Sequence, residues 1–144
     1  MTTEKKKSSL YTAYETDSEL EKDGTWFQVG AGDVEFKMAR AGGANEKYSK
    51  MLTRKTKPLR RQIQAEVLDE EVARHLMMEV FVTTVMKDWR GNITDRDGNP
   101  MGPFTREKCT QLFTDLPDLF SECQELAGKA AAYRKHVLEA DQGN

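Results

Sequence analysis

The sequence has few of the residues from which catalytic and metal sites are usually built. It contains two cysteines and two histidines in 144 residues. Neither histidine stands near a cysteine at the spacing of metal ligands, and neither has a nucleophile context around it. Its glycine-rich stretch is not followed by the Gly-Lys-Ser/Thr of a phosphate loop. We therefore expect no cofactor, no metal and no enzymatic activity.

Long apolar runs are also missing. The basic start of the chain is not followed by an apolar segment, so we expect no signal peptide. No run approaches the roughly 18 apolar residues that are needed to span a bilayer. We therefore expect a protein of the cytoplasm that has no membrane partner, with Cys109 and Cys123 as reduced thiols.

A strong charge of one sign is absent too, because the formal net charge is -2. Such a chain has no global basic field to recruit nucleic acid. The charge is nevertheless uneven: residues 1–61 carry 13 Lys and Arg against 9 Asp and Glu, and residues 62–144 carry 9 against 15. An electrostatic fit within the chain or head-to-tail between copies would explain this, and two solvated faces would explain it equally well.

What is present indicates a mainly α-helical protein with a small N-terminal β-hairpin, which is an α+β fold. The polar residues 1–22 predict a flexible segment, residues 23–140 a single domain, and residues 141–144 a flexible tail. In residues 24–41 two short runs flank Gly30 and Asp33, and Val34, Phe36 and Met38 alternate with polar residues. An isolated hairpin is marginal in water, so this one must pack on helices or pair with another chain.

The remaining elements are predicted to be helices. Residues 69–89 form the central helix of a helical bundle, because only Glu79 is charged between Leu76 and Met86. Flanking helices are expected over residues 46–56, with Asn45 as N-cap, and over 59–65, 105–114 and 116–140. Asp95 and Asp97 lie in a loop that resembles a calcium site, but Gly98 and Arg106 occupy the wrong positions for one.

The most polarised segment is residues 47–61, which carries seven basic residues and no acidic one. A basic surface that faces an acidic protein, or the acidic half of the chain itself, explains this segment best. Nucleic acid is the other explanation, but there is little aromatic interleaving for base stacking.

Four segments, taken in order, resemble tail assembly chaperones of long-tailed bacteriophages: DGTWFQVG at 23–30, the segment 36–58, MKDWRGNITDRDGNP at 86–100, and the segment 103–127. The strand arginine, helix-start asparagine and tyrosine of that family correspond to Arg40, Asn45 and Tyr48. Its Trp-x-Gly and Asp-x-x-Gly motifs correspond to Trp89 with Gly91 and to Asp95 with Gly98. The likeness covers about residues 23–140.

The resemblance implies a non-catalytic protein of the infected host cell that is absent from the mature virion. Such proteins coat the tape measure protein, keep it soluble and help the tail tube protein to polymerise, and in many relatives a frameshift gives a longer second product. The apolar excess of residues 69–89 and the family motifs together suggest six partner-binding residues, which are Arg40, Tyr48, Met77, Phe81, Met86 and Trp89. Self-association through the hairpin edge is a further expectation. The alternatives are a minor structural tail or connector protein and a small nucleic-acid-binding regulator that uses residues 47–61.

Overall fold

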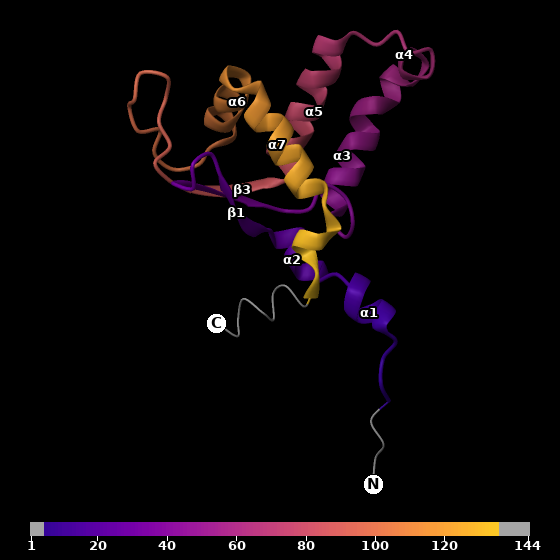
Figure 1. Cartoon of the computed structure of the whole chain (residues 1–144). Coiled ribbons are helices and arrows are strands. Elements are labelled where there is room, and N and C mark those ends of the chain that lie inside the picture. Colours follow the sequence, from indigo (N-terminus) through magenta and orange to yellow (C-terminus); the bar gives the residue numbers. More distant parts are fainter. Residues whose placement is uncertain (1–4, 136–144) are drawn as a thin grey trace.

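The computed structural model describes residues 5–135, and it shows an α+β fold in which helices predominate (Figure 1). The α-helices are α1 (Ser9–Tyr14), α2 (Ser18–Asp23), α3 (Glu46–Thr56), α4 (Arg60–Gln64), α5 (Glu70–Thr84), α6 (Arg106–Asp115) and α7 (Pro117–Gly128). Two 3-10 helices, η1 (Lys57–Leu59) and η2 (Ala130–Tyr133), complete the helical elements. The strands are β1 (Thr25–Val29), β2 (Val34–Met38) and β3 (Met86–Gly91). The predicted fold class is confirmed.

The strands form one antiparallel sheet in which β2 lies between β1 and β3. The predicted hairpin is confirmed as β1 and β2, with Phe27 opposite Phe36. On the other side of β2, Phe36 lies opposite Trp89 of β3. The hairpin therefore gains its third strand from its own chain, and this pairing occupies one of the edges that had been expected to meet another copy.

The prediction that the central helix continues to Trp89 was wrong. Helix α5 ends at Thr84, and residues 86–91 turn into β3. The apolar run conceals this change, because a buried helix and a buried strand look alike in sequence. Pairing with β2 makes residues 86–91 a strand instead of a helix. At the end of this strand the backbone of Gly91 adopts a φ of +105° where it passes Asp33.

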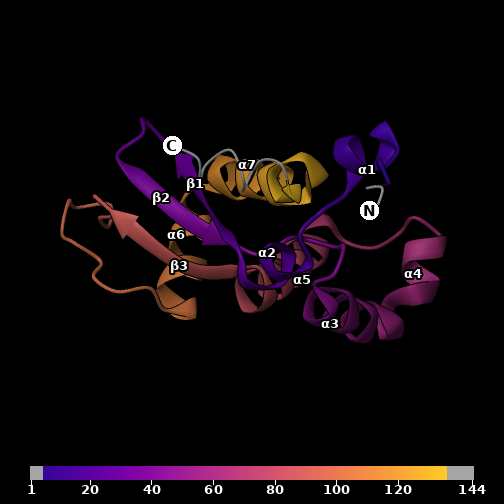
Figure 2. The same ribbon diagram turned by 90° about the horizontal axis from the view of Figure 1, so that it is seen from below.

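Helices α5, α6 and α7 cover one face of the sheet, and the core lies between these two layers (Figure 1). Its centre is a group of aromatic rings. Phe113 of α6 contacts Phe36 of β2, Phe81 of α5 and Phe120 of α7, with ring centroids 6.2, 6.0 and 5.2 Å away. Seen from below, the sheet occupies one side of the molecule, and α3 and α4 lie at the other (Figure 2).

The helix predicted over residues 116–140 is much shorter. It ends at Gly128, and the chain then forms η2. The physical reason is Tyr133, whose hydroxyl donates to the carbonyl oxygens of Met38 and Ala39 at 3.1 and 3.0 Å. An uninterrupted helix would not bring this side chain over the end of β2. The predicted tail at 141–144 and residues 136–140 lie outside the described residues.

The segment expected to be a flexible lead-in contains α1 and α2 within its described residues. Helix α2 is tied to the body through Glu21, which is 3% exposed. The carboxylate of Glu21 accepts hydrogen bonds from Arg40 Nη1 at 2.7 Å, Thr16 Oγ1 at 2.8 Å and the N–H of Ala44 at 3.2 Å.

Asn45 precedes α3 as predicted, but its side chain does not cap that helix. It donates to the carbonyl oxygens of Arg40 and Thr84 at 2.9 and 3.0 Å. A buried amide that donates two hydrogen bonds contributes more than an exposed cap, because leaving a buried polar group unpaired is costly. Asn45 therefore joins the start of α3 to the end of α5.

Candidate functional site: a cationic groove

A groove of about 540 Å³ lies where the start of α3, the end of α5, the start of β3 and the start of α6 meet. We call it the cationic groove. Five of its lining residues are basic, and none is acidic. These basic residues are Lys47, Lys50, Arg54, Lys87 and Arg106.

Among residues 5–135, four of these five cations have no ion-pair partner. Lys50 lies 3.5 Å from Glu46, and both side chains are largely exposed. Within residues 5–135, Lys47, Arg54, Lys87 and Arg106 form no salt bridge. Positive charge is therefore gathered in one place and is only partly neutralised, by Glu46 beside Lys50 and by Asp23 near Lys87.

The pKa of Lys87 reports the same concentration of charge. It lies below the ordinary value of 10.5, first because the ammonium group is partly buried and then because of repulsion from Lys47, Arg106 and Lys37. Asp23 opposes the shift but does not cancel it. A group whose charged form is disfavoured in this way is stabilised when an anion arrives beside it. The groove is thus electrostatically prepared for a negatively charged ligand.

The floor of the groove is partly apolar. Met51 and Met86 are 8% and 4% exposed, and the half-buried Phe104 also lines the groove. Methionine side chains adapt readily to differing partner surfaces. An apolar floor below a cationic rim fits a segment that carries both apolar and acidic side chains, such as an acidic amphipathic helix.

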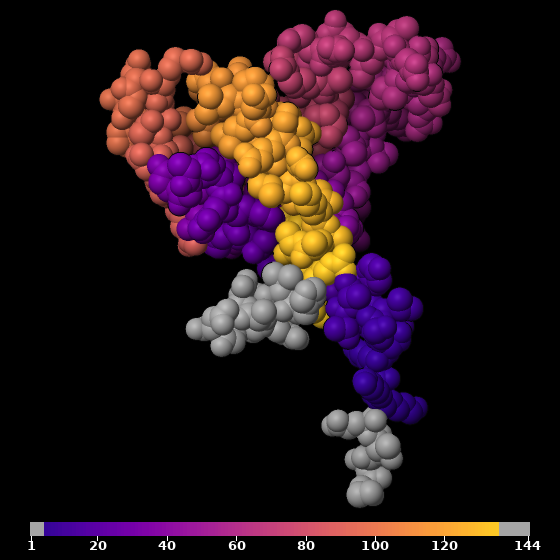
Figure 3. Space-filling view, viewed as in Figure 1, coloured from indigo at the N-terminus to yellow at the C-terminus, as the bar shows by residue number. Residues whose placement is uncertain are grey.

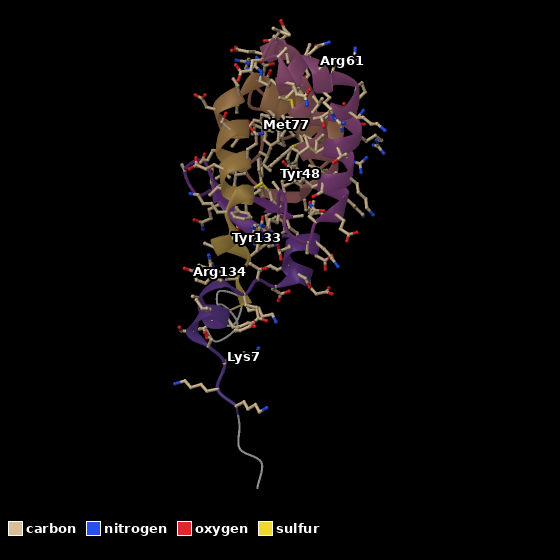
Figure 4. The ribbon with its side chains drawn as sticks, turned by 90° about the vertical axis from the view of Figure 1, so that its right-hand side faces the viewer. Lys7, Tyr48, Arg61, Met77, Tyr133 and Arg134 are labelled. Atoms are coloured by element: carbon tan, nitrogen blue, oxygen red, sulfur yellow. The ribbon has the colours of Figure 1, made fainter. Side chains whose placement is uncertain are left out.

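The basic segment 47–61 divides between two surfaces. Lys47, Lys50 and Arg54 line the cationic groove. Lys55 turns to Glu79 of α5, with which it forms a salt bridge of 2.9 Å. Lys57, Arg60 and Arg61 are exposed further along the chain, on η1 and α4. Figure 4 shows Arg61 near the end of the molecule that lies farthest from Lys7.

Only one of the six predicted partner-binding residues, Met86, lines the cationic groove. Phe81 and Trp89 are 1% and 6% exposed, and Trp89 Nε1 donates to the carbonyl of Gly102 at 2.9 Å. Met86 lies in the floor of the cationic groove, and its side chain is almost fully buried. These three side chains are therefore engaged mainly in packing, and a partner-binding role for them stays a prediction.

The other three predicted residues lie apart from one another. Arg40 pairs with Glu21 at the end of the sheet. Tyr48 of α3 and Met77 of α5 are half-buried against the core, and Figure 4 shows both on the side of the molecule where α3 packs on α5. They do not form a common surface with Arg40.

Sequence reasoning missed Lys87 and Arg106. They lie outside the basic segment, and only the fold brings them beside α3. No local pattern marks either residue, since Lys87 directly follows an apolar run and Arg106 opens an ordinary helix. Their contribution depends on tertiary structure alone.

The described part of the chain contains no group of three or more His, Cys, Asp or Glu side chains that could hold a metal ion. Asp95 instead accepts hydrogen bonds from the N–H groups of Asp97 and Asn99, both at 2.9 Å, which is turn chemistry. Cys109 and Cys123 are fully buried free thiols, and burial raises the pKa of both. Thiols of this kind are poor nucleophiles.

No helix within residues 5–135 combines the length and the apolar character that crossing a membrane requires. Comparison with curated proteins gives no match, and neither does comparison with solved structures. A family model described as YdaY prophage protein matches residues 43–144, a stretch that begins just before α3 and contains every residue of the cationic groove. That stretch is more than half of the chain, and the protein belongs to the YdaY prophage protein family.

Proposed function

We propose that this prophage protein is a non-catalytic tail assembly chaperone. In this proposal it binds the tape measure protein in the host cytoplasm, assists polymerisation of the tail tube protein and is absent from the mature virion. The observation that carries the binding role is the cationic groove, which combines an apolar floor with four basic side chains that form no ion pair within the described part of the chain. The prophage family agrees with a phage origin, and the motif resemblance supplies the link to tails.

The groove defines the chemistry of the bound segment. Arg54 and Arg106 suit carboxylates, because a guanidinium group can donate two parallel hydrogen bonds to one carboxylate. Met51 and Met86 suit apolar side chains of a helix. We therefore expect a helical segment of the partner with acidic residues along one edge of its apolar face. Binding of this kind weakens as salt is raised.

The test is co-expression with the tape measure protein of the same prophage. The wild-type protein should raise the soluble yield of the tape measure protein and co-purify with it. A variant with Lys47→Glu, Arg54→Glu and Arg106→Glu should lose both effects, because it reverses the charge of the groove. A tape measure protein that stays insoluble and never co-purifies with the wild-type protein contradicts the proposal.

A matched control is available on the same basic segment. Lys57→Glu, Arg60→Glu and Arg61→Glu reverse the same number of charges at exposed positions outside the groove. This control should bind the partner as the wild type does. Equal loss in both variants would show that general positive charge, and not the groove, is what matters.

A nucleic-acid-binding regulator is the second candidate function, favoured by the exposed Lys57, Arg60 and Arg61. Duplex binding by these residues would fall steeply with salt. It would also be lost in the control variant, which the chaperone role predicts to be unaffected. A stoichiometric signal for the protein in mass spectrometry of purified particles would instead favour a structural tail or connector component.

A further inference from the structure

The N-terminal arm, residues 5–14, projects from the body and carries exposed apolar side chains next to a cluster of positive charge. Leu10, Tyr11 and Tyr14 are 63%, 58% and 68% exposed, and α1 has no buried residue. Lysines occupy positions 5–7, and Figure 4 shows Lys7 on the segment that leads away from the body. A basic segment with this much uncovered apolar surface is suited to an apolar site with an acidic rim.

The body offers such a site in a second groove, about 510 Å³ in volume, between the β1–β2 turn, the loop after β3 and the junction of α6 with α7. We call it the acidic-rimmed groove. Its apolar lining includes Val34, Ile93, Leu116 and Leu119, and its rim carries Asp118 and Glu122. Leu116 is 48% exposed, which leaves apolar surface uncovered at the mouth of the groove.

Charged side chains of the arm and of the acidic-rimmed groove are free to pair with each other. Asp118 and Glu122 are exposed and have no salt-bridge partner in the described range 5–135, as is also true of the lysines at positions 5 and 6. Asp115, which also lines the groove, is already engaged by Arg96 at 3.5 Å and Gln111 at 3.1 Å. Charge complementarity therefore joins the lysines of the arm to the rim at Asp118 and Glu122.

The arm and the acidic-rimmed groove lie at opposite ends of the molecule. In Figure 3 the arm (indigo) leaves at the lower end, whereas the β1–β2 turn (purple) and the start of α7 (orange) lie toward the upper left. The arm is anchored where it meets the body, because Thr16 forms a β-bridge with Arg134 and Asp17 N–H donates to the carbonyl of Tyr133 at 2.8 Å. This placement favours the groove of another molecule over the groove of the same chain.

We propose that the N-terminal arm of one copy binds the acidic-rimmed groove of a second copy. Leu10 and Tyr11 enter the apolar part of the groove, and the lysines at positions 5 and 6 meet Asp118 and Glu122. The contact joins two different surfaces, so the first copy keeps a free groove and the second copy keeps a free arm after it forms. It therefore builds a head-to-tail series of copies, and it uses neither the cationic groove nor the unpaired edge of β1.

Sedimentation velocity of the full chain tests the proposal. The mass of the wild-type species should rise with protein concentration and fall as salt is added. An arm variant with Lys5→Glu, Lys6→Glu and Lys7→Glu should sediment as a single chain, and so should a groove variant with Asp118→Lys and Glu122→Lys. All five positions are exposed, so circular dichroism should show both variants folded.

Mixing the two variants is the decisive step. Each acidic arm then meets a basic groove, and each basic arm meets an acidic groove, so the mixture should associate although neither variant does so alone. A wild-type protein that stays monomeric at every concentration overturns the proposal, as does an arm variant that still associates. A mixture of folded variants that fails to associate overturns it too.

A cross-link adds a readout of position. Lys6→Cys and Asp118→Cys, placed in separate chains and mixed under oxidising conditions, should give a disulfide-linked dimer, since the native thiols are fully buried. Lys6→Cys mixed with Glu125→Cys, which lies on α7 outside the groove, is the control and should give far less. The cationic-groove variant should self-associate like the wild type, so this proposal and the proposed function fail separately.

Discussion

Glu21 and Arg40 form an ion pair in which Oε2 of the carboxylate lies 2.7 Å from Nη1 of the guanidinium. The two residues are 19 positions apart, and the pair fastens α2 to the end of the sheet. Gly43 packs directly on it, because a Cβ at that position would overlap Glu21 Oε2. The arginine that the phage-chaperone resemblance suggested as a partner contact thus has an internal structural role.

Replacing Glu21 by Gln should therefore destabilise the fold. The change leaves Arg40 without its counter-charge, and breaking a buried pair costs about 3 kcal/mol, somewhat less here because Arg40 remains partly exposed. Urea unfolding measures the loss. Glu19→Gln, at an exposed position of the same helix, is the control and should change the free energy of unfolding little. Equal stability of the two variants would contradict the structural role of the pair.

The same carboxylate should make stability depend on pH. Burial acts to raise the pKa of Glu21, but hydrogen bonds from Arg40, Thr16 and Ala44 outweigh it and hold the pKa below the ordinary value of 4.5. A lowered pKa means that the contribution is complete above about pH 4.5 and is lost as pH falls through the folded-state value. Denaturation midpoints across this range should fall more steeply for the wild type than for Glu21→Gln.

Gly91 should tolerate alanine much less well than Gly98. Both have positive φ, +105° and +85°, so both substitutions strain the backbone by about 1 kcal/mol. A Cβ at Gly91 would also overlap the carbonyl oxygen of Asp33, whereas one at Gly98 meets nothing within 4 Å. The steric overlap should add about 1–3 kcal/mol at Gly91. The difference in Tm between the two variants measures the cost of the steric overlap. Similar Tm values would contradict the β2–β3 geometry.

Lys87→Gln should stabilise the protein while weakening anion binding. The pKa of Lys87 is lowered by burial and by neighbouring cations, so its charged form costs the fold free energy below that pKa, and the cost disappears as pH rises through it. We expect a gain on the order of 0.5 kcal/mol at neutral pH and low salt. Chemical denaturation with and without salt measures it. Lys57→Gln, exposed and outside the groove, should show no gain.

Cys109 and Cys123 should resist alkylation in the native protein. Both side chains are fully buried, and burial raises the pKa of Cys123 to about 12, so almost no thiolate exists at neutral pH. Iodoacetamide should modify neither thiol in buffer and both in concentrated urea, as mass spectrometry can show. Rapid modification in buffer would contradict the packing of α6 on α7.

Local sequence patterns were sufficient wherever neighbouring residues determine the structure. The alternation of Val34, Phe36 and Met38 identified β2, and Thr105 marked the start of α6, where its hydroxyl oxygen accepts from Lys108 N–H at 3.1 Å. Local patterns failed where contacts with residues far away in the sequence determine the structure. Strand β3 depends on pairing with β2, and the end of α7 depends on a hydrogen bond that spans 95 residues.

The sequence predicted part of the cationic groove. The basic residues of α3 were recognised, and so was their suitability for an acidic protein partner. Lys87 and Arg106 join them only after β3 and α6 have packed, and burial turns Met86 from a presumed contact into a floor residue. The number of basic residues along a segment can be read from a sequence. The gathering of basic residues from α3, β3 and α6 around one groove cannot, because it depends on how these elements pack.

The link between the two ends of the described chain has a consequence for biosynthesis. Asp17 bonds to Tyr133, and Lys135 Nζ lies 3.0 Å from the carboxylate of Glu15. These contacts cannot form until the last of these residues has left the ribosome, although α2 is made among the first. The anchor that holds the N-terminal arm in place is therefore set only after synthesis of the body is complete. Nascent chains in which residues 133–135 are not yet exposed lack that anchor, and only molecules made beyond Lys135 present a fixed arm to a neighbour.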